Sequence, residues 1–288
     1  MTFPRAARKA GAKAIHTQYN LSPLAGRSGV TTIHDVSFFI GPEWFLPRDR
    51  LLLSRFVPAS AKRAAAVLTV SQTSRDEIER FIPNTIGKIT VTPLALNPRV
   101  HPVERMAAEE LLLSELGIKA PYVLTVGTQW PRKNTRLAID AARLLPRSIP
   151  HRLVVTGKSG WGDTPESDRI VRPGYVSDEQ LSALYSAASL YLLPSFHEGF
   201  GLTLLEAFAC RCPVLASRGG AIPETAGSGA ALVADWEPST WSSEIERILG
   251  DSGTLEEMQR KGLQRLANFS WSDTAHRTIE VYRQVGSW

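Results

Sequence analysis

Hydrophobic residues recur along this chain in short unbroken runs, separated by longer segments in which they are spaced three or four apart. The runs are typical of buried β-strands, and the spaced segments of amphipathic helices. Alternation of the two predicts an α/β fold with parallel sheets that are covered by helices on both faces. The expected strands lie at residues 29–39, 65–71, 88–96, 122–128, 151–157, 190–195 and 212–217.

Helix start signals support this alternation. Helices are expected over residues 75–82, 135–145 and 177–188, and Ser74 and Ser177 are the candidate N-caps of the first and the last. A serine in this position accepts a hydrogen bond from an otherwise unpaired amide of the first turn.

The strand pattern stops over residues 97–110, and a new strand begins at Tyr122. A chain of 288 residues is long enough for two domains. We therefore expect one Rossmann-like domain over residues 1–100 and a second over 101–272. The first part opens with a helical segment instead of a strand and a phosphate-binding turn, so we expect the first domain to be incomplete.

Composition narrows the class of protein. The chain is 43% hydrophobic and 21% charged, as globular proteins are, and no apolar run is long enough to span a membrane. The first residues carry charge but no apolar core of a secretory signal. Cys210 and Cys212 have no neighbouring histidine or second cysteine pair, so we expect no zinc site but two buried, reduced thiols in a cytoplasmic protein.

Charge is unevenly distributed. Residues 1–75 contain eleven Lys or Arg against three acids, Asp35, Glu43 and Asp49. Such a segment suits an anionic membrane surface or a phosphorylated lipid, although ordinary solvated charge explains it equally well. Nucleic acid is not an expected partner, because the chain has no helix-turn-helix, zinc or basic-aromatic signature. The oligomeric state is not indicated.

The stretch HEGFGLTLLE, residues 197–206, forms a turn between an expected strand and an expected helix. Gly199 and Gly201 let the backbone approach a ligand, and the first amides of the helix favour an anion such as a diphosphate. Glu198 then lies beside whatever is attached to the phosphates, and Glu206 suits the hydroxyls of a ribose. The spacing predicts a nucleotide diphospho-sugar site. A capped helix with two solvated acids is the alternative that this stretch alone leaves open.

Two further loops favour the same ligand. Arg132 and Lys133 follow the strand over 122–128 at the start of a helix, where cations are unfavourable unless an anion such as a diphosphate offsets them. A surface basic pair is the plainer alternative. Tyr175 and Val176 precede the capped helix at Ser177, and their backbone can hold a base.

The chain as a whole resembles a known family. The stretches GTQWPRKN, VVTGKSGWG, GGAIPETAG and ANFSWSDTAHRTIEVYR, with the long segment from Arg172 to Ser217 that contains EGFG and Glu206, are similar to the nucleotide-sugar domain of family 4 retaining glycosyltransferases of GT-B architecture. TTIHDVSFFIGPEWF and AAAVLTVSQTSRDEIERF resemble the back half of that family's acceptor domain. Resemblance is tightest to the bacterial subgroup that builds cell-surface polysaccharides, often from GDP-mannose. It also implies a C-terminal helix, residues 273–288, that crosses back to the first domain.

The resemblance implies roles for individual residues. Glu198 would bind the donor-sugar hydroxyls, and Glu206 the ribose. Lys133, with Arg132 beside it, would neutralise the leaving diphosphate, which is electrostatic catalysis. His34 matches a histidine near the donor sugar, although a structural histidine before an aspartate is equally consistent. Further donor contacts are expected at Gly127, Thr128, Tyr175, Val176, Gly199, Phe200, Gly201 and Leu202.

From this resemblance we expect a retaining hexosyltransferase that needs no metal and no cofactor. Its first candidate donor is GDP-mannose, and its acceptor is a cell-surface glycan or a lipid-linked sugar. We expect it in the cytoplasm, on the inner membrane face, where the basic first quarter and Trp44-Phe45 would meet a lipid-linked acceptor.

The sequence departs from the family pattern at three places, and these bear on the expected transferase activity. Thr128 stands where an arginine is frequent, and Arg211 where a glycine is common. The family's first strands have no counterpart upstream of Met1. The alternative is therefore a catalytically incomplete fragment that binds a nucleotide sugar, or one half of a two-chain glycosyltransferase. An epimerase or a phosphorylase of the same architecture explains the RKN and EGFG stretches less well.

Overall fold

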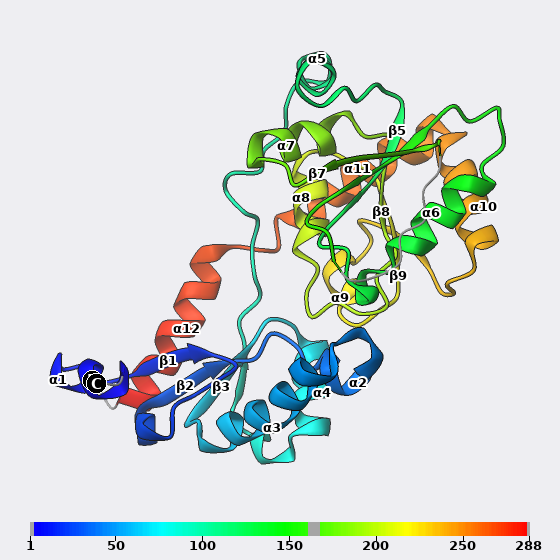
Figure 1. Cartoon of the computed structure of the whole chain (residues 1–288). Coiled ribbons are helices and arrows are strands. Elements are labelled where there is room, and N and C mark those ends of the chain that lie inside the picture. The colour runs from blue at the N-terminus through cyan, green and yellow to red at the C-terminus, as the bar shows by residue number, and fades with distance from the viewer. Residues whose placement is uncertain (1–2, 161–167, 287–288) are drawn as a thin grey trace. The chain divides into compact units, whose positions relative to one another are not determined.

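The computed structural model describes residues 3–160 and 168–286, so Trp161 and Gly162, at the end of VVTGKSGWG, lie outside the described residues. The chain divides into two compact units. The first comprises Met1–Leu94, Glu198–Phe200 and Ser270–Trp288, and the second comprises Ala95–His197 and Gly201–Phe269. Each unit has a parallel sheet of its own with helices packed on it (Figure 1).

The first unit is built on four strands in the order β1-β2-β3-β4, counted over the described residues, and every neighbouring pair is parallel. Its elements are α1 (Phe3–Lys9), β1 (Ile15–Gln18), β2 (Gly29–Thr32), α2 (Ser37–Ile40), α3 (Pro47–Arg63), β3 (Ala66–Thr69), α4 (Gln72–Phe81), β4 (Ile89–Val91) and α12 (Trp271–Gly286), with short 3-10 segments at Pro23–Ser28, which is kinked at Gly26, and at Pro42–Trp44 and Pro83–Thr85.

Helix α12 is distant in sequence but packs on the first unit's sheet (Figure 1). Its Val281 is buried against Val30 of β2 and Leu68 of β3. The Tyr282 hydroxyl lies 2.6 Å from Nδ1 of His16, whose Nε2 lies 2.7 Å from the Thr32 hydroxyl. Apolar packing and a hydrogen-bonded chain thus hold the helix on the sheet.

Two boundaries in the first unit differ from the expectation. The strand expected over 29–39 ends at Thr32, and a short helix begins at Ser37, because the Asp35 carboxylate accepts a hydrogen bond from the Ser37 amide at 2.8 Å. Helix α4 begins at Gln72 with Ser71 as its N-cap, so Ser74 as the cap was wrong. The Ser71 hydroxyl accepts from the Ser74 amide at 3.0 Å.

Trp44 and Phe45, which were expected to meet a lipid-linked acceptor, are both half-buried. Phe45 packs against the core of the first unit and its ring lies 6.4 Å from that of Phe38. Trp44 covers Gly41, where an added Cβ would lie 2.3 Å from the indole. The apolar side chains that this unit exposes lie elsewhere.

The second unit carries a parallel sheet in the order β10-β9-β8-β5-β6-β7, which has six strands over the described residues. Its elements are α5 (Arg105–Leu116), β5 (Tyr122–Val126), a 3-10 turn at Pro131–Lys133, α6 (Thr135–Leu144), β6 (Arg152–Thr156), β7 (Ile170–Gly174), α7 (Asp178–Ala187), β8 (Leu190–Leu193), α8 (Leu202–Ala209), β9 (Val214–Ser217), α9 (Ile222–Ala226), β10 (Ala231–Val233), α10 (Pro238–Leu249) and α11 (Ser252–Leu266).

Buried aliphatic residues of the strands form the second unit's core together with α6 and α10. Trp241 of α10 is fully buried there, and its indole N–H donates to the Asp235 carbonyl at 3.0 Å. Ser177 caps α7 as expected: its hydroxyl accepts from the Gln180 amide at 3.1 Å, and the Gln180 side chain accepts from the Ser177 amide at 2.9 Å.

Strands β7 and β10 were not predicted. They stand at the two edges of the sheet as described, where a strand needs a partner on one side only. β7 contains Arg172 and Pro173, and β10 has only three residues. β7 lacks the apolar run that marks the central strands, because an edge strand is partly exposed. β10 does lie in an apolar run, AALVA over residues 230–234, but that run is short.

The strand order of the second sheet reverses between β5 and β8. From β5 the chain proceeds outward through β6 and β7, and then returns to place β8, β9 and β10 on the other side of β5. Ligands of open parallel sheets bind beyond the carboxyl ends of the strands at such a reversal. The loops that follow β5 and β8 are therefore the first place to look for a site.

Both thiols are free and buried, as expected, and burial raises the pKa of Cys210 to about 12. No helix in the described part of the chain is long and apolar enough to cross a bilayer.

Candidate functional site

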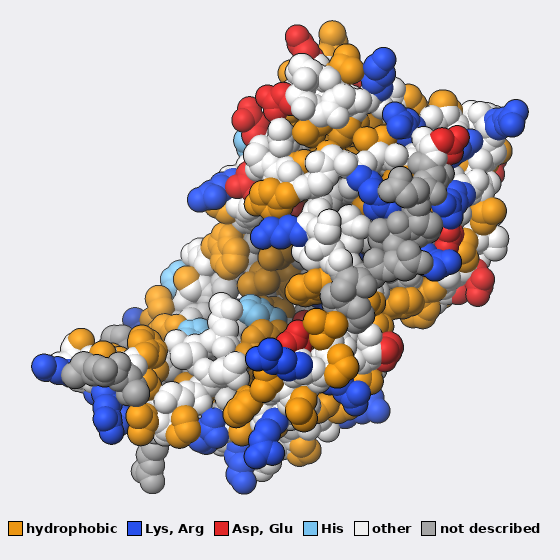
Figure 2. All heavy atoms as spheres, in the orientation of Figure 1, with side chains coloured by type: hydrophobic (Ala, Val, Ile, Leu, Met, Phe, Trp, Pro, Cys, Tyr) orange, Lys and Arg blue, Asp and Glu red, His pale blue; other side chains and the backbone are white. Residues whose placement is uncertain are grey.

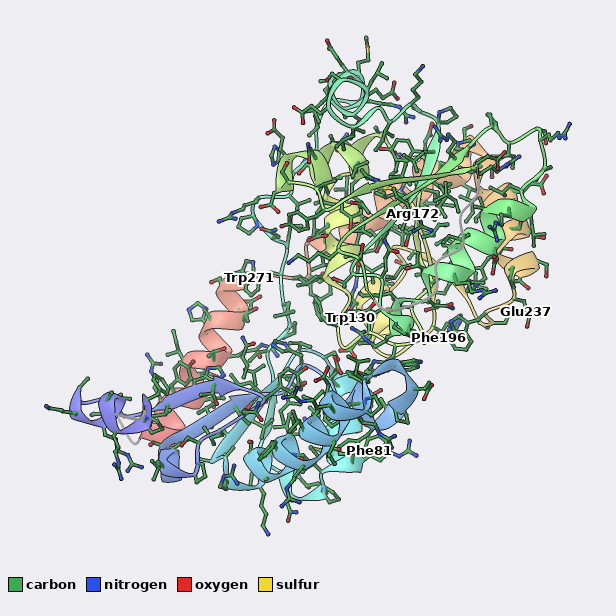
Figure 3. The ribbon with its side chains drawn as sticks, in the orientation of Figure 1. Phe81, Trp130, Arg172, Phe196, Glu237 and Trp271 are labelled. Carbon is green, nitrogen blue, oxygen red and sulfur yellow. The ribbon has the colours of Figure 1, made fainter. Side chains whose placement is uncertain are left out.

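The loops after β5 and β8 are joined to each other at the strand reversal. The backbone amide of Phe196, after β8, donates to the carbonyl of Arg132, after β5, at 2.9 Å. The Arg132 guanidinium in turn donates to the carbonyl of His197. Trp130 and Phe196 mark the two loops in Figure 3. Arg132 thus holds the two loops together, a role that residue type alone did not reveal.

Two glycines allow the loops after β6 and β9 to come close to the loops after β5 and β8. A Cβ on Gly157, after β6, would lie 2.2 Å from the Gly127 carbonyl oxygen, and one on Gly219, after β9, would lie 2.3 Å from that of Phe196. Such distances require glycine. Sequence reasoning did not single out either one, although a glycine one or two residues beyond a strand is the signal that would have found them.

Lys133 lies across the end of β5. It closes the 3-10 turn Pro131–Lys133, and Asn134 then adopts a left-handed conformation with φ of 48° before α6 begins at Thr135. The two cations therefore precede the helix instead of opening it. The Lys133 side chain runs over Gly127, its Cε 3.5 Å from the position of a Cβ there. Thr128 and Arg132 are half-buried in the same loop.

Glu206 is the fifth residue of α8, the helix that follows β8, and its side chain is half-buried. Burial raises the pKa of its carboxyl to about 7, while a hydrogen bond from the Tyr185 hydroxyl at 3.2 Å and the positive charge of Lys133 act in the opposite direction. Tyr185 is fully buried on α7, and its hydrogen bond holds the Glu206 carboxyl in place. A half-buried carboxyl with this pKa donates or accepts a hydrogen bond near neutral pH.

Helix α8 begins without a side-chain cap. Its N-cap is Gly201, which has a left-handed φ of 92°. That conformation is unfavourable for any residue with a Cβ. The first amides of the helix, from Leu202 onward, therefore face the space before it, and the helix dipole adds positive potential there. Leu202 itself is 37% exposed.

Glu198 precedes the first residue of this helix by four residues and is only 6% exposed, and the adjoining His197 is 3% exposed. Gly199 and Phe200 are also buried. Neither acid of HEGFGLTLLE is therefore a solvated surface carboxylate, which excludes the plainer interpretation of the stretch. A buried carboxylate must be paired or hydrogen-bonded to be stable.

Tyr175 and Val176 lie beyond β7. The Tyr175 ring is 74% exposed and has the Lys158 ammonium 5.5 Å from its centre, while Val176 is half-buried. Their loop is tied to β6, because the Gly174 carbonyl accepts from the Gly157 amide at 2.9 Å and from the Thr156 hydroxyl at 2.8 Å. An exposed ring on an anchored loop is free to contact a base.

His34 belongs to the first unit and follows β2. Its ring is half-buried, 5.7 Å from that of Tyr19, and burial lowers its pKa although the charge of Asp35 opposes the shift. A neutral imidazole at the carboxyl end of a strand is suited to hydrogen bonding with a sugar hydroxyl.

Comparison with known proteins decides the family. Residues 113–265 match the model of the family described as "Glycosyl transferases group 1". The O-antigen chain mannosyltransferase B of Escherichia coli is 36% identical over 267 residues, which cover 88% of this chain and 70% of that protein. The chain belongs to the group 1 glycosyltransferases. This confirms the resemblance inferred from the sequence.

Other relatives of this glycosyltransferase differ in length. The serotype-specific mannosyltransferase WbdA of Escherichia coli is 27% identical over 243 residues, which are 79% of this chain but 30% of that protein. Among solved structures, the sucrose-phosphate synthase of Thermosynechococcus elongatus aligns with a TM-score of 0.78 and 24% identity over 99% of this chain and 76% of that one. The structural likeness confirms the predicted α/β fold of GT-B type with two parallel sheets.

Proposed function

We propose that this glycosyltransferase transfers mannose from GDP-mannose to a cell-surface glycan or a lipid-linked acceptor. The observation that carries the proposal is the arrangement at the strand reversal of the second sheet. The Lys133 side chain runs over Gly127 beyond β5, and the half-buried Glu206 lies on α8, whose uncapped start supplies amides. One cation, one carboxyl and a set of amides match the diphosphate and ribose of a nucleotide sugar. The choice of mannose and GDP rests on the mannosyltransferases among its relatives.

Each residue then has a role at a stated group. Lys133 and the first amides of α8 stabilise the negative charge that develops on the leaving diphosphate. Glu206 binds the ribose hydroxyls, and Glu198 binds the hydroxyls of the transferred sugar. Arg132 positions both loops through the His197 carbonyl. The proposed transfer retains the anomeric configuration, and it needs no metal because these cationic and amide groups supply the positive potential that a metal would supply.

A donor screen tests this directly. The midpoint of thermal unfolding is measured with GDP-, UDP- and ADP-sugars, since a ligand that binds only the folded state raises it. We expect the largest rise with GDP-mannose and an unchanged rise in EDTA. Transfer to mannose oligosaccharides is then assayed, with the anomeric configuration of the product read by NMR.

The Glu198→Gln variant separates catalysis from binding. It should retain the rise in midpoint with GDP alone and lose transfer. Lys119→Gln, an exposed lysine ahead of β5, is the matched control and should behave as the wild type. Binding of a nucleotide sugar by the wild type without any turnover would instead favour a binding fragment or half of a two-chain enzyme. No rise with any nucleotide sugar would overturn the proposal.

A further inference from the structure

Helix α3 of the first unit has an outer face that is unusual for a globular protein. It is held to the core by Val57, Ser60 and Ala61. At 100° per residue, the opposite face of the helix carries Arg48, Leu51, Leu52, Arg55, Ala59 and Lys62, and Phe56 and Arg63 lie on its flank. Leu51 is 66% exposed, Leu52 43% and Phe56 47%. A surface helix normally presents polar residues there, so three adjacent large apolar side chains on one face indicate a partner.

The charges on this helix have one sign. It contains five cations, Arg48, Arg50, Arg55, Lys62 and Arg63, against Asp49 alone. In the part of the chain that the structure describes, no carboxylate forms an ion pair with any of the five. Helix α11 shows the ordinary arrangement, in which Glu257 pairs with Arg260 at 2.6 Å and with Lys261 at 3.2 Å. The cations of α3 are available to an external anion.

A cavity of about 670 Å³ adjoins this face. Arg55 and Arg63 line it together with Phe56 and the segment Asn20–Pro23, and no carboxylate is among its lining residues. The Arg63 guanidinium donates to the Leu21 carbonyl at 3.0 Å, which holds this cation at the cavity. Two guanidinium groups beside an aromatic ring suit a phosphate that is attached to an apolar group. By contrast, the cavity of about 480 Å³ at α10 and α11 is lined by both Asp251 and Glu257 beside its cations.

We propose that the outer face of α3 binds the surface of an anionic phospholipid bilayer. Leu51, Leu52 and Phe56 enter the boundary between headgroups and acyl chains, and the Arg55–Arg63 cavity takes the phosphate of one lipid. Apolar and cationic side chains that alternate on one helix are the pattern of interfacial membrane binding. In Figure 2, orange hydrophobic and blue basic side chains lie side by side over the part of the first unit where Figure 1 shows α3. A soluble anion would explain the arginines but not the exposed leucines.

The test is co-sedimentation of the full chain with vesicles of phosphatidylcholine, with and without phosphatidylglycerol, in the absence of any donor. We expect at least about tenfold tighter binding to the anionic vesicles, and weaker binding at high salt. Leu51→Glu/Leu52→Glu should weaken it about tenfold or more, and Arg55→Gln/Arg63→Gln by a similar factor. Leu113→Glu and Arg147→Gln, exposed residues of the second unit, are the matched controls and should bind as the wild type does.

Three results would overturn the proposal. The first is equal binding of the wild type to neutral and anionic vesicles. The second is binding by the Leu51→Glu/Leu52→Glu variant that is as tight as that of the wild type. The third is a wild-type dimer in sedimentation velocity that dissociates in the same variant. Binding of inorganic phosphate to the protein without any vesicle binding would likewise overturn the proposal and assign the cavity to a soluble anion. Each variant is checked by its thermal midpoint, so loss of the fold is recognised. Because no donor is present, the outcome does not depend on the proposed transfer reaction.

Discussion

The two loops that flank the strand reversal of the second sheet differ in exposure and in charge. The loop over residues 127–134 is half-exposed and carries Arg132 and Lys133, with Trp130 47% exposed. The loop over residues 194–201 is buried throughout except for the half-buried Phe196, and it carries Glu198. Both follow central strands that pair directly, Val123 with Leu190 and Leu124 with Tyr191.

This difference in exposure determines whether a substitution in the loop changes catalysis alone or changes folding as well. In a buried loop every polar group needs a partner, so a substitution there that removes a polar group or adds bulk disturbs folding and ligand binding together. A change of equal shape, such as Glu198→Gln, is the exception because it keeps a polar group in the same place. In a half-exposed loop water replaces the contacts of a removed side chain, so its chemistry can be tested in an intact fold. The first loop is therefore where catalysis can be measured by itself, and the second is where it is tied to stability.

Lys133→Ala should have the largest effect. Removing a preorganised positive group from a developing oxyanion costs about 10²- to 10³-fold in rate, or about 2.7–4 kcal/mol. We expect that loss in kcat for mannosyl transfer, with a free energy of unfolding within about 0.5 kcal/mol of wild type because the side chain is half-buried. Lys119→Ala serves as the control. A Lys133→Ala enzyme with wild-type kcat would mean that another group carries the charge of the leaving diphosphate.

Gly219→Ala should destabilise the buried loop over residues 194–201. Its Cβ would lie 2.3 Å from the Phe196 carbonyl oxygen, and that atom belongs to backbone that cannot rotate away. Overpacking of this kind costs about 1–3 kcal/mol, measured as a fall in the free energy of urea unfolding, and we expect transfer to fall with it. The matched substitution is Gly253→Ala in α11, where the nearest atom to the new Cβ is at 3.4 Å. Equal stability of the two variants would show that the buried loop has room to shift.

The sequence predicted the interior of the fold better than its edges. Central strands such as β5 and β8 are mostly apolar, with Thr125 the one polar residue of β5, because both their faces are covered, and this pattern identifies them without further knowledge. The edge strand β7 contains Arg172 and Pro173, and its pairing with β6 is decided by tertiary structure. Similarly, the strand expected over 29–39 ended where the side chain of Asp35 bonded the Ser37 amide, a local competition that hydrophobicity does not report.

For the site, the sequence identified charged residues but not their surroundings. It named Lys133 and Glu206, and the fold brings them close enough for the lysine to lower the glutamate's pKa. It did not identify Tyr185 as the hydrogen-bond donor to Glu206, nor Arg132 as the link between loops, because both roles arise from burial and from strand order. Gly157 and Gly219, which follow strands, indicate in the sequence that a close approach is required, but only the structure shows which backbone atoms they approach.

Tyr185→Phe should have the smallest effect, and it tests how the buried side of the site controls its charge. The pKa of Glu206 is about 7 in the folded protein against an ordinary value near 4.5. The folded state therefore binds more protons than the unfolded state between these values, and the free energy of unfolding falls as pH rises through that window, by about 3 kcal/mol at most. Loss of the Tyr185 hydroxyl removes a hydrogen bond that lowers this pKa. The decline should then extend to higher pH and cost about 1 kcal/mol more at pH 8.

Urea unfolding from pH 4.5 to 8.5 measures this decline, with Glu206→Gln as the reference that cannot ionise. We expect the wild type to lose stability relative to Glu206→Gln as the pH rises, and Tyr185→Phe to lose more. Because Lys133 also lowers the glutamate's pKa, Lys133→Ala should move the decline in the same direction as Tyr185→Phe, which connects the half-exposed loop to helix α8. Parallel pH profiles for the wild type and Glu206→Gln would contradict a neutralised carboxyl, and would mean that Glu206 meets the ribose already ionised.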